Sequence, residues 1–129
     1  MGKTLLWIFG VVFVVVGLLG WVDNPLVGAN GLFQTNTMHD LVHLVIGVIF
    51  ILVALFAADS GPMAFKVIGV VYLLVAVLGF VMTPNGGALL GLVQTNMADH
   101  WLHVVLGVVL LAIGFLMPAD DASSGSAMA

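Results

Sequence analysis

Four long apolar runs, separated by short polar segments, constrain the fold of this chain more than any other feature of its sequence. Each run is close to the roughly 20 residues that a helix needs to cross about 30 Å of hydrocarbon. Backbone polar groups in lipid must be satisfied within the protein, and the runs lack the alternation of barrel strands, so helices are predicted. The predicted helices are residues 4–22, 38–58, 63–82 and 98–117.

The composition supports a bilayer rather than water as the solvent. Hydrophobic residues make up 63% of the 129 residues and charged residues only 6%, against about 25% charged residues in an ordinary soluble domain. The chain has no cysteine, which excludes disulfide and thiol chemistry. Six acidic residues against two basic ones give a net charge of −4, so nothing here could neutralise nucleic-acid phosphates.

The two halves of the chain resemble each other at an offset of sixty residues. Residues 31–36 (Gly-Leu-Phe-Gln-Thr-Asn) and 91–96 (Gly-Leu-Val-Gln-Thr-Asn) are near copies. We therefore predict an all-α membrane protein of four transmembrane helices, built as two parallel, duplicated helical hairpins related by an axis along the membrane normal. The transmembrane domain covers 1–118, with repeats at about 1–60 and 61–118, and 119–129 is predicted to be a disordered acidic tail.

Small residues recur at equivalent points of the two hairpins. They are Gly10, Gly17 and Gly20 in the first run, Gly69, Ala76 and Gly79 in the third, and Gly47 and Gly107 in the second and fourth. Small residues let membrane helices approach closely enough for van der Waals packing to hold them. We interpret them as helix-packing positions.

The orientation in the membrane rests on the two lysines. Lys3 precedes the first run and Lys66 lies near the turn between the second and third runs, so both lie on one side of the membrane. The positive-inside rule makes that side cytoplasmic, which predicts a multi-pass protein with both termini inside.

All four histidines fall in the two copies of the repeated segment, directly after Asn36 and Asn96. These asparagines are predicted to cap the second and fourth helices. The first turns of those helices then hold a candidate structural polar cluster, which consists of His39, Asp40, His43, Asp99, His100 and His103. Ionisable groups at membrane depth are costly unless paired or facing a cavity, so we expect the cluster to point into the bundle.

The two copies exchange histidine and aspartate at adjacent positions. His43 corresponds to His103, whereas His39 corresponds to Asp99 and Asp40 to His100. We therefore predict that His39 meets Asp99, or that Asp40 meets His100, as a charge-assisted pair that holds the halves together.

Alternative functions for the cluster use the same residues. His43 and His103, on facing helices, could bind a haem or other tetrapyrrole metal axially. The four imidazoles and two carboxylates could instead hold a transition metal, or the histidines could handle protons or a solute. The spacing of these residues is not diagnostic of a particular metal. If the cluster only holds the helices together, we expect no cofactor.

The motifs around the histidines resemble an uncharacterised family of prokaryotic four-span membrane proteins, domain of unknown function 4383. The resemblance runs from about residue 5 to residue 117 and rests on three segments: the Asn36-x-x-His39-Asp40-x-x-His43 element, residues 69–72 (Gly-Val-Val-Tyr) and residues 99–103 (Asp-His-Trp-Leu-His). It implies a bacterial or archaeal plasma-membrane protein and brings no established activity.

The sequence as a whole favours a small membrane protein without catalysis. Almost nothing is predicted to project beyond the bilayer, and the loops offer no residues for a catalytic pocket. We expect an accessory or scaffold subunit that contacts lipid and packs against a larger membrane complex or against copies of itself. Haem, tetrapyrrole or metal binding through His43 and His103 is the alternative.

Overall fold

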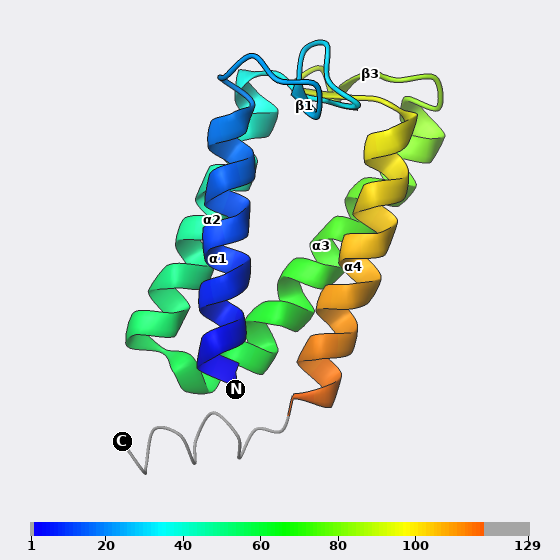
Figure 1. Ribbon diagram of the computed structural model, residues 1–129. Coiled ribbons are helices and arrows are strands. Elements are labelled where there is room, and N and C mark those ends of the chain that lie inside the picture. The colour runs from blue at the N-terminus through cyan, green and yellow to red at the C-terminus, as the bar shows by residue number, and fades with distance from the viewer. Residues whose placement is uncertain (1, 118–129) are drawn as a thin grey trace.

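The computed structural model describes residues 2–117, and these contain four long helices joined by two loops and one tight turn (Figure 1). Their bounds are α1 Gly2–Leu19, α2 Thr37–Phe56, α3 Gly61–Met82 and α4 Met97–Leu116. Each is long and apolar enough to cross a membrane, which confirms the predicted four-helix membrane fold. The predicted tail at 119–129 lies outside the described residues.

The first helix ends three residues earlier than predicted because the following polar segment turns back on it. The Asn24 side-chain amide donates hydrogen bonds to the carbonyls of Leu19, Val22 and Val27, at 2.8, 2.6 and 2.9 Å. Carbonyls at a helix end have no partner within the helix, and one asparagine here satisfies the last of them.

Two pairs of short strands, which were not predicted, cover one end of the bundle. Strands β1 (Val27–Gly28) and β2 (Phe33–Gln34) pair in parallel within the α1–α2 loop. Strands β3 (Gly87–Leu89) and β4 (Val93–Thr95) pair antiparallel within the α3–α4 loop. Segments of two or three residues are too short to show the alternation by which a strand is recognised.

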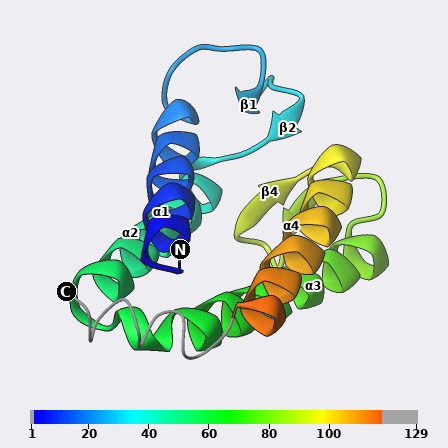
Figure 2. The same cartoon turned by 60° about the horizontal axis from the view of Figure 1, so that its bottom comes forward.

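At the opposite end, the one-turn 3₁₀ helix η1 (Ala58–Ser60) leads directly into α3. This connection is the tight turn between the two helical hairpins, α1–α2 and α3–α4. Figures 1 and 2 show the hairpins side by side, with both loop segments at the same end. That they are duplicated copies related by an axis along the membrane normal stays a prediction.

Glycines allow the two helices of each hairpin to touch through their backbones. A Cβ atom added to Gly47 of α2 would lie 2.7 Å from the Gly10 carbonyl oxygen and 2.7 Å from the Val14 nitrogen. In the second hairpin, a Cβ atom at Gly69 would lie 2.9 Å from the Leu111 nitrogen. The small residues therefore lie at helix contacts, as van der Waals packing in lipid requires.

An aromatic core joins the two hairpins midway along the helices. Phe9 and Phe13 of α1, Phe50 of α2 and Phe65 and Tyr72 of α3 make its ring contacts, with centroids 5.0 to 6.2 Å apart. Edge-on and tilted pairs of this kind contribute about 0.5–1.5 kcal/mol each beyond their area burial. Side chains, rather than close backbone contacts, therefore make most of the interface between the hairpins.

We expect Gly47→Ala to lower the free energy of unfolding in detergent micelles by about 1–3 kcal/mol, the usual cost of overpacking. Alanine alone would favour the helix by about 1 kcal/mol, but the added methyl group meets backbone atoms that cannot rotate away. Denaturant titration followed by circular dichroism measures the change. Val45→Ala, on the half-exposed outer face of the same helix, is the control and should change it by no more than about 0.5 kcal/mol. Equal midpoints for both variants would contradict the close approach.

Candidate functional site

The predicted polar cluster lies at the loop end of the bundle, in the first two turns of α2 and α4. All six side chains are buried, with exposed fractions of 7% or less. They are His39, Asp40, His43, Asp99, His100 and His103. The structure therefore turns these polar groups away from lipid, as their desolvation cost demands.

Asn36 and Asn96 occupy the N-cap positions of α2 and α4. The Asn36 side-chain oxygen accepts a hydrogen bond from the His39 backbone N–H at 3.0 Å. Asn96 accepts from the Asp99 N–H at 2.9 Å, and the Asp99 carboxylate accepts in return from the Asn96 N–H at 2.9 Å. This second pair is a capping box, which satisfies two free donors at once.

The same two asparagines also bind the loop of the opposite hairpin. The Asn36 amide donates to the Leu92 carbonyl at 3.0 Å, and the Asn96 amide donates to the Leu32 carbonyl at 2.8 Å. The Gln94 N–H in turn donates to the Asn36 side-chain oxygen at 3.2 Å. We call these reciprocal hydrogen bonds the loop clasp, because they tie each hairpin to the other at the loop end.

The predicted contact between His39 and Asp99 is not formed in residues 2–117. The His39 Nδ1 atom instead lies 2.6 Å from the Gln94 carbonyl oxygen, in β4 of the opposite hairpin. The Asp99 carboxylate caps its own helix and faces the backbone of Gln34 in β2. Both side chains thus find backbone partners in the short strands, which the sequence did not reveal.

The predicted contact between Asp40 and His100 is also not formed in the described part of the chain. The Asp40 carboxyl group lies against Gly20 at the end of α1, and the His100 ring lies against Gly79 of α3. The His100 Nε2 atom is 2.7 Å from the Thr83 carbonyl oxygen, its hydrogen-bond partner. Each residue therefore fills a space left by a glycine within its own hairpin, which keeps the two apart.

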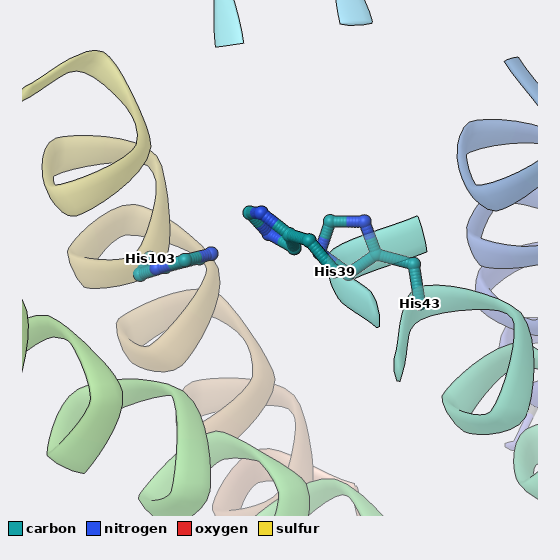
Figure 3. A group of neighbouring side chains, drawn as sticks. All are labelled: His39, His43 and His103. Carbon is teal, nitrogen blue, oxygen red and sulfur yellow. The ribbon is translucent and has the colours of Figure 1, made fainter. Parts of the chain in front are cut away.

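Three of the four histidines do meet. One nitrogen from each of His39, His43 and His103 lies within 4.8 Å of the other two, and all three residues are buried. Figure 3 shows the His103 ring reaching from α4 toward the two rings on α2. The ring centroids are 4.6 Å apart for His39 and His43, 5.7 Å for His39 and His103, and 6.5 Å for His43 and His103. We call these three residues the histidine cluster.

An apolar cavity of about 190 Å³ adjoins the histidine cluster. Aliphatic side chains of α2, α3 and the β3–β4 segment make most of its lining, together with the three imidazoles and Tyr72. The Tyr72 hydroxyl and the Nδ1 atoms of His43 and His103 are buried and have no hydrogen-bond partner among the described residues. Because nearly all buried polar groups in proteins have partners, these three atoms call for an explanation.

The arrangement brings together three imidazoles beside an apolar cavity. Within residues 2–117, no carboxylate, thiol or serine hydroxyl joins the three imidazoles, and Ser60 lies at the far end of the bundle. Neutral imidazole is a good metal ligand and hydrogen-bond partner. The sequence had predicted a contact between His39 and Asp99, with His43 and His103 as a possible ligand pair. It had also offered a wider metal site of four imidazoles and two carboxylates, of which the structure brings three imidazoles together.

We expect Asn36→Ser to weaken the loop clasp while keeping the helix cap. Serine caps helices about as well as asparagine but is too short to reach Leu92, so each lost hydrogen bond should cost about 0.5–1.5 kcal/mol. Asn36→Ala also removes the cap and should cost about 1 kcal/mol more. Denaturant titration in micelles checks both variants against Asn30→Ser, a control in the exposed part of the same loop. Stability of Asn36→Ala equal to that of the control would count against the clasp.

The comparison with known proteins bears on the whole bundle. The sequence model of the family described as "Domain of unknown function (DUF4383)" matches residues 3–116, which include the histidine cluster and the loop clasp. No curated protein and no solved structure matches the chain. The resemblance seen in the histidine motifs is thus confirmed over nearly the full length, and the chain belongs to the DUF4383 family.

Proposed function

We propose that this protein is a non-enzymatic component of the bacterial or archaeal plasma membrane that packs, as an accessory or scaffold subunit, against a larger membrane complex or against copies of itself. The observation that carries the proposal is the outer surface of the helices. Between 28% and 33% of each membrane-spanning window is buried within the protein. Many of the other side chains are large, apolar and exposed, so they face lipid or another protein.

The use of the polar groups supports a role without catalysis. The capping asparagines, His39, Asp99 and His100 all hold backbone groups of the loops or helix ends. Outside the helices, the described residues form two loops that contain paired short strands, and one tight turn. A subunit of this kind acts through its surface in the membrane, where close packing of small and apolar side chains supplies association.

A haem or other tetrapyrrole between His43 and His103 is not favoured by the geometry. The neighbouring cavity of about 190 Å³ is smaller than the roughly 300–1,000 Å³ of pockets for drug-sized ligands. The His39 ring also packs against both of the other rings, at 4.6 and 5.7 Å, where a macrocycle would have to lie. A single metal ion needs much less volume than a macrocycle.

Single cysteines can be introduced at either end of the bundle to test its orientation in the membrane, since the chain has no cysteine of its own. Lys3 and Lys66 lie near the starts of α1 and α3, at the end opposite the loop clasp, and the positive-inside rule makes that end cytoplasmic. In intact cells, a membrane-impermeant maleimide should label Asn30→Cys, in the exposed α1–α2 loop, and leave Ser60→Cys, in the η1 turn, unlabelled. Permeabilised cells, in which both should react, are the control. The reverse pattern in intact cells would refute the orientation.

Site-specific photo-crosslinking in native membranes tests association. A photoreactive residue is placed on the outer face of each helix, at Val11, Val45, Val77 or Val108, which are 49–58% exposed. We expect at least one of these positions to give an adduct of discrete protein mass, identified by mass spectrometry as one partner or a second copy. Phe50, which is fully buried, is the control and should give none. Lipid adducts alone at all four outer positions would rule out the accessory role.

A further inference from the structure

We propose that His39, His43 and His103 form a transition-metal site with three protein ligands and an open coordination position that faces the apolar cavity. This extends the ligand-binding alternative from two histidines to three. It concerns the isolated chain, so it holds or fails independently of any role in a membrane complex. Four observations on the site support it.

The first observation is the arrangement of the donor atoms on two facing helices. His39 and His43 lie four residues apart, on one face of α2, and His103 faces them from α4 (Figure 3). Their nitrogens lie within 4.8 Å of one another. Zinc–nitrogen bonds of about 2.0–2.1 Å place tetrahedral ligands about 3.3 Å apart, so an ion bound here would draw the three nitrogens closer together.

The second observation is the hydrogen bond that orients His39. A carbonyl oxygen can only accept, so the contact of 2.6 Å to the Gln94 carbonyl places the proton on His39 Nδ1. The other nitrogen, Nε2, then carries the free lone pair. Metal-binding histidines characteristically donate their second ring N–H to a carbonyl or carboxylate, which fixes the ring and raises its basicity.

The third observation is that three of the buried polar atoms without partners in residues 2–117 lie at the histidine cluster, the others being on Thr35, Asp40 and His100. The Nδ1 atoms of His43 and His103 have none among the described residues, and neither has the Tyr72 hydroxyl beside them. The Tyr72 and His103 ring centroids are 5.4 Å apart. Burying three imidazoles with so few hydrogen-bond partners is unfavourable if their role is only structural. They are a usable ligand set, however, because each neutral ring offers one lone pair.

The fourth observation is that neither neighbouring carboxylate belongs to the ligand set. Asp40 lies against Gly20 and Asp99 caps α4, so neither carboxylate belongs to the histidine cluster. A ligand set of imidazoles alone suits zinc, copper, iron or nickel, whereas calcium and magnesium prefer oxygen. Three protein ligands leave a fourth position for water or a small molecule, and the adjoining cavity of about 190 Å³ provides the space for it.

Metal binding is tested with Zn²⁺ and Co²⁺ on the full-length chain, purified in micelles with a tag that contains no histidine. After treatment with a chelator, the wild-type protein should bind one ion per chain, and Co²⁺ should give the visible absorption of a tetrahedral site. X-ray absorption on the zinc form should show three imidazole nitrogens at about 2.0 Å. Zn²⁺ should also raise the unfolding temperature, since ligands brought together by two packed helices bind it more tightly than the unfolded chain does.

Single variants assign the ligands. His39→Ala, His43→Ala and His103→Ala should each weaken Zn²⁺ affinity at least tenfold, since even loss of a hydrogen bond to a ligand costs about 10–100-fold. His100→Ala is the matched control, because this histidine is equally buried at the same end of the bundle but lies outside the cluster. Its affinity should stay within about twofold of the wild type. Helical circular dichroism and elution volume show which variants are folded, and His→Gln replaces any that is not.

The proposal is overturned if the wild-type chain binds no stoichiometric Zn²⁺ or Co²⁺, a measurement that needs no variant. It is also overturned if folded variants at His39, His43 and His103 bind as tightly as the wild type, or if His100→Ala loses as much affinity as they do. Photo-crosslinking of the outer helix faces is unaffected by any of these outcomes, so failure of the metal site and failure of the accessory role can be told apart.

Discussion

The hydrocarbon interior offers no water to polar groups, and the rest of this structure follows from that constraint. Along the helices the backbone satisfies itself, but each helix end leaves donors or acceptors without partners. At the loop end, Asn36 and Asn96 supply those partners and at the same time bind the loop of the opposite hairpin. The loop clasp is therefore both a pair of helix caps and the polar connection between the two halves.

The loop clasp and the aromatic core both hold the two hairpins together, by different interactions. The aromatic core is apolar and packs α1 and α2 against α3, whereas the clasp is directional and sets the register of the loops. The histidine cluster lies between them, at the point where α2 faces α4. An ion bound there would add a third connection between the hairpins, so metal content and bundle stability are expected to be linked.

The exchange of histidine and aspartate between the two copies has a local explanation. Asp99 completes a capping box at the third position of its helix, where its carboxylate accepts a hydrogen bond from the Asn96 N–H. His39, at the equivalent position, points instead to the Gln94 carbonyl and so comes to lie between His43 and His103. Asp40 and His100 fill different spaces beside Gly20 and Gly79. Because of this exchange, the equivalent positions of the two repeated segments make different contacts. The histidine cluster is therefore asymmetric, with two histidines from α2 and one from α4.

The sequence by itself determined the membrane fold, because the length and polarity of an apolar run decide whether a helix can cross lipid. It also determined the two N-caps and the clustering of the polar residues at one end, since these depend on spacing along single helices. Only the tertiary structure decided which side chains meet. His39 turns to Gln94 rather than to Asp99 because two three-residue strands, too short to be seen as a pattern, bring a free carbonyl within reach. The same strands close over the three histidines and help line the cavity beside them, so the geometry of the candidate site depends on loop contacts that no periodicity encodes.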